Sequence, residues 1–242
     1  MDAIALFFLL LVAEVLGTIG GFGSSMLVMP IAGLILPFDQ ALGLTAVLHV
    51  FSNAAKMLLF RQAVSKRLLL TLGLPAILGV LVGARLTYYL DENALGLSLG
   101  LLLLAMSSFL LIRRTWRLRA TDRNAVLGGL LSGSIAGISG TGGAIRGITL
   151  AAFDLEKLVF VSTSAWIDMG VDLSRTIVYT AQGYVTSAVL THLPVLAAAS
   201  FVGTWIGRRL LLRLPQERFK VIVLALVMVM GIVSVVQALT AH

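Results

Sequence analysis

The chain has 242 residues, of which 59% are hydrophobic and only 12% are charged, and its mean hydropathy is +1.02. This composition lies far outside the range of soluble globular domains and predicts an integral protein of the lipid bilayer. A net charge of +7 does not indicate nucleic-acid binding, because the cations fall in short polar gaps between apolar stretches. With no cysteine and three scattered histidines, neither a disulfide nor a metal site is expected.

Apolar stretches follow one another along the chain, and most have the length that crosses a bilayer once as a helix of about 20 residues. Two stretches are too long for one crossing, and glycine clusters interrupt both. The predicted first repeat, 1–112, has a re-entrant hairpin over 3–36 and helices over 40–60, 67–89 and 94–112. After a basic linker, 113–123, the second repeat, 124–242, has a hairpin over 125–153 and helices over 157–181, 185–207 and 219–239.

Glycine spacing and charge together predict how the two halves are oriented. The glycines of Gly17–Gly23 align with those of Gly137–Gly143 at a constant offset, which indicates an internal repeat. If each broken segment returns to its own side, every Lys and Arg at the polar ends except Arg85 faces the cytoplasm, as the positive-inside rule favours. A single crossing by each broken segment leaves no such bias.

The expected fold is therefore an all-α integral membrane protein of two inverted-topology repeats, each a broken segment plus three transmembrane helices. The basic loops 61–67, 113–123 and 208–220 are expected to be cytoplasmic. Because residues 1–17 carry no cation, charge alone leaves open a full crossing by the first broken segment, and symmetry favours a hairpin.

The second break reads "GISGTGGAIRG", which raises the question of a phosphate-binding loop. The GxxxxGK[ST] template has no match, and the stretch follows a helical run rather than a strand, so nucleotide binding is not expected. Broken helices at membrane depth instead line cavities, where the N-termini of half-helices attract anions. We therefore expect an anion site at the two breaks, formed by Gly20, Gly21, Gly23, Ser24 and Ser25 and by Ser139, Gly140, Thr141, Gly142 and Gly143.

Polar stripes on two helices accompany the breaks, each with i, i+4, i+7 spacing that places its members on one helical face. The first stripe is His49, Asn53 and Lys56, and the second is Asp168, Asp172 and Arg175. Ionisable groups in spanning helices are costly and are functional candidates by default. Asn53, Arg146 and Arg175 are the predicted anion ligands, and His49, Lys56, Asp168 and Asp172 are the predicted proton-coupling or gating residues.

Structural alternatives stay open for Arg175, Lys56 and Arg146, and the alternative for Arg146 is packing or extension to the membrane surface. Arg175 has an intrahelical partner in Asp172, and Lys56 has the length to extend to the inner membrane surface. Glu14, in the entering half of the first hairpin, is expected to pair with Arg146 or Lys56 rather than to bind substrate.

Four motifs together resemble one known family. "GTIGGFGSSMLVMP" near the start, "GISGTGGAIRG", and the glycine-rich helix "GVLVGARL" with its echo "GTWIGRRL" resemble the sulfite exporter TauE/SafE family, also called the sulfonate uptake permeases. The resemblance covers nearly the whole chain. It implies a multi-pass carrier of the bacterial inner membrane, without a cofactor, for small anions such as sulfite, organosulfonates or sulfoacetate-like acids.

Two other classes of protein stay open as alternatives. Gly137–Gly140 spells GxSG and His192 follows on a later helix, an order that resembles rhomboid intramembrane serine proteases with Ser139 as the nucleophile. The first break has no matching serine, so a non-enzymatic role shared by both halves is preferred. An anion channel is the second alternative. The Gly79-x3-Gly83 pattern is typical of close helix packing, and it also suggests a homodimer.

Overall fold

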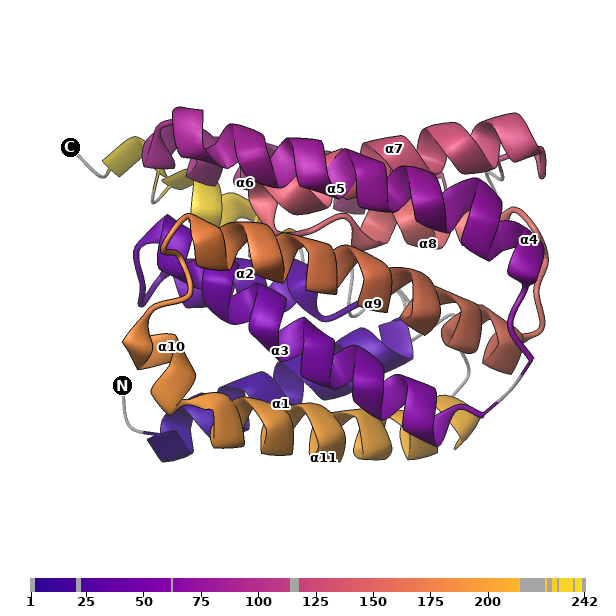
Figure 1. Cartoon of the computed structure of the whole chain (residues 1–242), viewed down its shortest axis with the longest axis horizontal. Helices are drawn as coiled ribbons and strands as arrows, with labels where there is room; N and C mark the ends of the chain where they lie inside the picture. Colours follow the sequence, from indigo (N-terminus) through magenta and orange to yellow (C-terminus); the bar gives the residue numbers. More distant parts are fainter. Residues whose placement is uncertain are drawn as a thin grey trace.

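The structure is a computed structural model, and all regular elements in the residues it describes are helices, which confirms the predicted all-α class (Figure 1). No strand occurs among these residues. Parts of the predicted helix 219–239 and of the linker 113–123, and Gly21, lie outside them. The described residues are 3–20, 23–61, 63–113, 118–213, 225, 228–229, 231–236 and 238–240.

The helices of the first half follow the predicted segments closely. In chain order they are α1 (Ala3–Gly20), α2 (Ser25–Gly33), α3 (Phe38–Leu59), α4 (Lys66–Leu68), α5 (Leu74–Leu86) and α6 (Glu92–Ile112). A π-helical turn, Leu69–Gly73, makes α4 and α5 one continuous rod, which a 3-10 turn, Thr87–Tyr89, extends. The Asp91 carboxylate starts α6 by accepting hydrogen bonds from two backbone N–H groups of its first turn.

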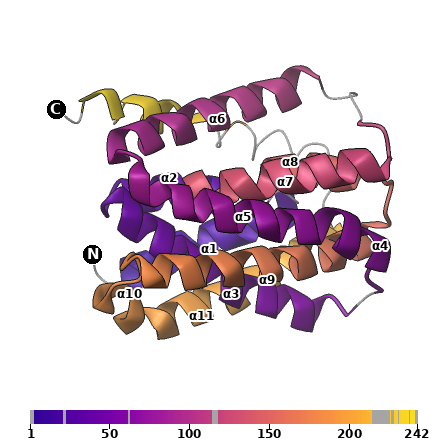
Figure 2. The ribbon, with the colours of Figure 1, turned by 45° about the horizontal axis from the view of Figure 1, so that its top comes forward.

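The second half repeats this order up to the C-terminal segment. Its helices are α7 (Asp122–Ser139), α8 (Gly143–Ala151), α9 (Lys157–Ala181), α10 (Ser187–Thr191) and α11 (Leu193–Arg213). Thr121 caps the start of α7, and Gly140 ends it in the left-handed conformation with φ of 75°. Residues 231–236 lie beside α6, where Gly100 meets Val235 (Figure 2).

Several described helices are long and apolar enough to cross a membrane: Phe38–Leu59, Lys66–Tyr89 and Leu193–Arg213. Shorter apolar helices cover Ile4–Ile19 and Asn93–Phe109. α9 has 25 residues but carries the polar stripe, and its length still exceeds that of a bilayer crossing. These lengths fit an integral membrane protein.

The predicted helix 185–207 is wrong in its end and its continuity. The structure has two helices there, α10 and α11, which meet at His192. Pro194 lacks the backbone N–H that would donate to the Leu190 carbonyl in a continuous α-helix. This missing hydrogen bond accounts for the interruption. α11 runs on to Arg213, and the guanidinium of Arg209 lies 3.7 Å from the centre of the Trp205 ring.

In both broken segments the chain turns back along itself. Gly17 of α1 lies against Ser24, and Leu6 and Leu10 of α1 line the same apolar cavity as Ile35, just past the end of α2. α8 likewise lies along α7 (Figure 1), with Gly128 against Thr149 and Gly142 against Ser132. Each broken segment therefore starts and ends at the same end of the bundle.

The two halves are interlocked through glycine contacts between their helices. α5 packs on α7, where Gly79 and Gly83 lie against the backbone around Ser134. α11 packs on α1 in the same way, where Gly203 and Gly207 lie against Glu14 and Thr18 respectively. These glycine faces are occupied inside the chain, so the expectation of a homodimer through an exposed glycine face loses its basis.

The starts of α4 and α7 lie at the end of the bundle opposite the start of α1 (Figure 1). Arg67, at the start of the α4–α5 rod, forms an ion pair of 2.7 Å with Asp122, at the start of α7. Arg208 of α11 lies over the ring of Phe60, just past α3. The described parts of the three basic loops thus lie at a common end.

Candidate functional site

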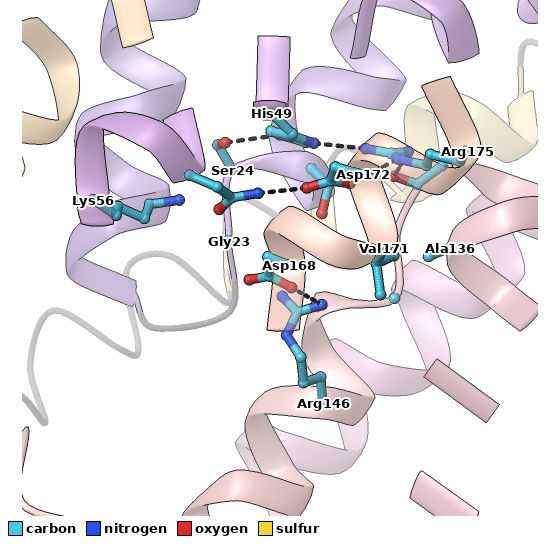
Figure 3. Close-up of a pocket in the computed structure, with 15 residues that line it drawn as sticks. Gly23, Ser24, His49, Lys56, Ala136, Arg146, Asp168, Val171, Asp172 and Arg175 are labelled. Carbon is cyan, nitrogen blue, oxygen red and sulfur yellow. Dashed lines mark hydrogen bonds and ion pairs between the residues drawn. The ribbon is translucent and has the colours of Figure 1, made fainter. Parts of the chain in front are cut away.

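The two breaks meet at a small buried cavity between α3 and α9 (Figure 3). Its volume is about 20 Å³, which is roughly the space of one or two water molecules. Among the predicted site residues with described side chains, all but Ser139 and Thr141 line this cavity, and Ala136 and Val171 complete the lining. Gly20 is the last residue of α1.

The α3 stripe contributes three polar side chains to one wall of the cavity. His49, Asn53 and Lys56 are all buried, as their shared helical face predicts. Lys56 is only 8% exposed and extends toward the cavity (Figure 3), so the alternative in which it reaches the membrane surface is wrong. In the described part of the chain, no ion pair involves its ammonium group.

Arg175, on the α9 stripe, is the most highly connected residue of the site. Its Nε donates to Asp172 Oδ1 over 2.7 Å, so the predicted alternative of an intrahelical pair is present. Its two other nitrogens reach further: one donates to the Gly140 carbonyl oxygen over 3.1 Å and the other to His49 Nδ1 over 2.8 Å. A guanidinium presents its donors in a fixed fork, which suits it to join both helices and the second break.

The two aspartates of α9 each hold an arginine. Asp172 accepts from Arg175 and, at its other oxygen, from Asn53 over 2.6 Å. Asp168 forms an ion pair with Arg146 of α8, and Ser164 donates to the same carboxylate. The second break is thereby anchored to α9 by the buried Arg146–Asp168 ion pair and by the hydrogen bond from Arg175 to Gly140. A buried ion pair stays favourable only while both partners remain in place.

Glu14 belongs to this network, and its expected pairing with Arg146 or Lys56 is not what the structure shows. It is fully buried in α1, and its two carboxylate oxygens accept hydrogen bonds from Ser24 over 2.5 Å and from Ser52 over 2.6 Å. Ser24 also lies 2.9 Å from His49 Nε2. The sequence signal was its position inside an apolar helix, but its partners come from distant segments.

The first break supplies side chains to the cavity. Ser24 and Ser25 both line it, and Ser25 Oγ lies 3.3 Å from Thr141 Oγ1 across the two breaks. Gly23 has φ of 81°, a conformation that glycine adopts without strain. A methyl group at this position would lie 3.8 Å from the Arg146 guanidinium.

The second break supplies backbone and close packing. Gly140 offers its carbonyl to Arg175, while any side chain there would collide with Met29. Gly142 also lines the cavity, and a side chain there would collide with the Ser132 carbonyl of α7, so close packing requires a glycine at this position. Ser139, predicted to bind substrate, instead donates to the Ile135 carbonyl.

The protease alternative does not fit this geometry. Ser139 Oγ is bonded within α7, and His192 Nδ1 lies 2.6 Å from the Ala188 carbonyl at one end of the bundle. In the part of the chain that the structure describes, no hydrogen bond joins the two side chains. A nucleophile and its base must be within hydrogen-bond reach.

A cationic cavity at the meeting point of two broken helices, inside an apolar helical bundle, defines a membrane transporter. The family model described as Sulfite exporter TauE/SafE matches residues 6–234, nearly the whole length. The chain therefore belongs to the TauE/SafE sulfite exporter family, which consists of transporters and not enzymes. Comparison with curated proteins and with solved structures gave no match.

Proposed function

We propose that this protein is a proton-coupled secondary transporter that carries small sulfur-containing or organic anions across the bacterial inner membrane. Sulfite, organosulfonates and sulfoacetate-like acids are the substrate classes. The observation that carries the proposal is the cavity itself, in which polar groups from both breaks and both stripes surround a small space.

The charge of the lining favours an anion of low charge. Lys56, Arg146 and Arg175 contribute three positive charges to the cavity, and Asp168 and Asp172 contribute two negative charges. The arginines are held by the aspartates, which leaves the Lys56 ammonium as the cation without an ion pair among the described residues. An anion that enters therefore meets one surplus positive charge in a setting of low dielectric.

Alternating access around this site is the proposed mechanism. The exchange of partners between halves, α5 with α7 and α11 with α1, supports two inverted repeats that move against each other. The cavity is too small for a sulfonate in the described conformation, so binding must widen it. A site this small favours a carrier over the alternative of a channel, which needs a continuous pore.

Exchange across liposomes tests the carrier. Purified protein in liposomes should exchange labelled sulfite for unlabelled sulfite or sulfonate with saturation. Lys56→Met should abolish most of this exchange, whereas Lys66→Met, at the exposed start of α4, should leave it intact. Uptake that never saturates would favour a channel, and equal exchange in both variants would remove Lys56 from the site.

Orientation is tested by single-cysteine labelling, which is clean because the chain has no cysteine. Cysteines placed at Arg119 and at Arg213 should both react only with a reagent applied from the cytoplasm, because the positive-inside rule assigns both basic loops to that side. Labelling of the two positions from opposite sides would contradict the inverted arrangement.

A further inference from the structure

A chain of hydrogen bonds leads from the cavity to Glu14, and its direction is fixed at both ends. Arg175 has only donors, so His49 Nδ1 must accept from it. The neutral imidazole therefore carries its hydrogen on Nε2 and donates to Ser24 Oγ. Ser24 in turn donates to Glu14 Oε1, and Ser52 donates to Oε2, as suits an ionised carboxylate.

The two ends of this hydrogen-bond chain, His49 and Glu14, lie in different surroundings. His49 and Ser24 line the cavity, whereas Glu14 is fully buried behind Ser24 and against Gly203 of α11. The charged groups that face His49 are Lys56 of α3, Arg146 of α8 and Arg175 of α9.

Among the described residues, fewer charged groups lie near Glu14 than near His49. Lys56 of α3 and Asp172 of α9 are the charged groups near it, together with the hydroxyl groups of Ser24 and Ser52. An ionised carboxylate without a direct ion pair is costly at this depth, and protonation removes that cost.

A proton and Arg175 compete for one atom, His49 Nδ1. If Nδ1 gains a hydrogen, two donors face each other over the present distance of 2.8 Å, and the contact is lost. Arg175 then has a free N–H group at the cavity, which an anion can accept. Conversely, an anion that draws Arg175 away exposes the lone pair of Nδ1 to protonation. Because such coupling is reciprocal, each ligand strengthens binding of the other.

We propose, on the basis of the anion transport proposed above, that the transported proton enters at His49 Nδ1 in exchange for Arg175 and is stored on Glu14. The proton bonds to Nδ1, the Nε2 hydrogen passes to Ser24 Oγ, and Ser24 passes its own hydrogen to Glu14 Oε1. The imidazole ends neutral in its other tautomer, the serine is unchanged, and the carboxylate becomes a neutral acid. One proton and one monoanion together add no net charge to the buried site.

In this proposal Glu14, a residue of the first half, carries the transported proton. Asp168 and Asp172 stay ion-paired with Arg146 and Arg175. The proposal also predicts that transport of a monoanion is electroneutral. Glu14→Gln preserves the shape of the side chain and leaves it neutral, so the variant should move the anion without its proton and respond to membrane voltage instead.

The test uses the purified full chain in liposomes with labelled methanesulfonate, which stays a monoanion at working pH, so that any proton movement belongs to the protein. For the parent protein, a gradient of about one pH unit should sustain about a tenfold accumulation, independent of voltage. Glu14→Gln should keep exchange of labelled for unlabelled anion, lose accumulation driven by pH, and gain uptake driven by voltage.

Ser24→Ala removes the hydroxyl group that joins His49 to Glu14, while both of these residues remain. This variant should lose accumulation driven by pH in the same way. Its matched control is Ser200→Ala, which removes another buried serine that contacts α3 through the Leu48 carbonyl, and which should behave like the parent. Glu14→Asp keeps a carboxylate and should keep coupling. If Glu14→Gln does not fold, Ser24→Ala against Ser200→Ala decides the matter.

Two outcomes count against the inference, and they are distinct. If the parent exchanges the anion and Glu14→Gln still accumulates it under a pH gradient to the parent level, the proton does not reside on Glu14. If the parent exchanges neither methanesulfonate nor sulfite, the proposed transport function itself fails.

Discussion

The first break, between α1 and α2, and the second, between α7 and α8, share a glycine spacing but supply different groups to the cavity. The first supplies hydroxyl groups, through Ser24 and Ser25, and one glycine that is open toward the cavity, Gly23. The second supplies a backbone carbonyl from Gly140, and its Gly142 is packed against α7. The shared glycine spacing therefore predicts that the backbone turns back at both breaks. The groups that each break presents to the cavity depend on the direction of the Cα–Cβ vector at each position.

The largest effect is expected from Gly142→Ala, which tests packing at the second break. Its methyl group would collide with the Ser132 carbonyl, and overpacking against backbone should cost about 3 kcal/mol or more in stability. Gly33→Ala is the control, because among the described residues outside its own helical turn no atom lies within 4 Å of the added methyl group. Thermal unfolding in detergent should separate the two variants clearly. Equal melting temperatures would mean that the second break is as open as the first.

Arg175 is the residue through which the two breaks are joined, and its removal should have the next largest effect. Arg175→Ala should weaken anion affinity by about 1.5 to 3 kcal/mol, the range for a hydrogen bond to a charged group. Arg175→Lys keeps the charge but not the fork, so its loss should be smaller. Calorimetry on folded protein measures both, with the exposed Arg85→Ala as control. Parent-like affinity in Arg175→Ala would confine the residue to holding α9 and the second break together.

Gly23→Ala tests whether the first break is open toward the anion. The left-handed conformation should cost about 1 to 2 kcal/mol in stability for any L-residue, and the methyl group would also approach Arg146 at the cavity. Gly183→Ala is the control. Gly183 has nearly the same φ, 82°, among the described residues it has open space around it, and it does not line the cavity. Both variants should lose similar stability, but only Gly23→Ala should lose anion affinity. A parallel loss in Gly183→Ala would trace the effect to stability alone.

The smallest effect is expected from the direct contact between the breaks, Ser25 with Thr141. At 3.3 Å this hydrogen bond is long, so its coupling energy should be about 0.5 to 1 kcal/mol. A double-mutant cycle with Ser25→Ala and Thr141→Val, followed by thermal unfolding, measures it. A coupling energy near zero would leave Arg175 as the main link between the breaks.

Helical periodicity made the two stripes predictable from the sequence. Residues at i, i+4 and i+7 share a face in any α-helix, so His49 is expected on the same face as Lys56, and Asp168 on the same face as Arg175, each about two turns apart. The glycine clusters likewise located both breaks. These inferences needed only local geometry, which the sequence specifies directly.

The partners of Glu14 and the orientation of Gly142 were beyond such reasoning. Ser24 reaches Glu14 from the first break and Ser52 reaches it from α3, and their meeting depends on how the break and α3 pack against α1. Gly142 follows a left-handed turn at Gly140 that sets the direction of its Cα–Cβ vector, and no pattern in the sequence reports that angle. Ser139 lies outside the cavity lining, and its hydroxyl bonds a carbonyl of its own helix, as a serine near a helix end readily does.

The glycine seam between α1 and α11 constrains the order in which a ribosome can build this protein. α1 precedes α11 in the chain, so Glu14 and Thr18 are synthesised well before Gly203 and Gly207, which cover them. Until α11 emerges, the nascent chain holds a carboxylate on a helix face that still lacks its cover. α1 must therefore be retained by the insertion machinery, or by water at its margin, while most of the remaining chain is threaded past it.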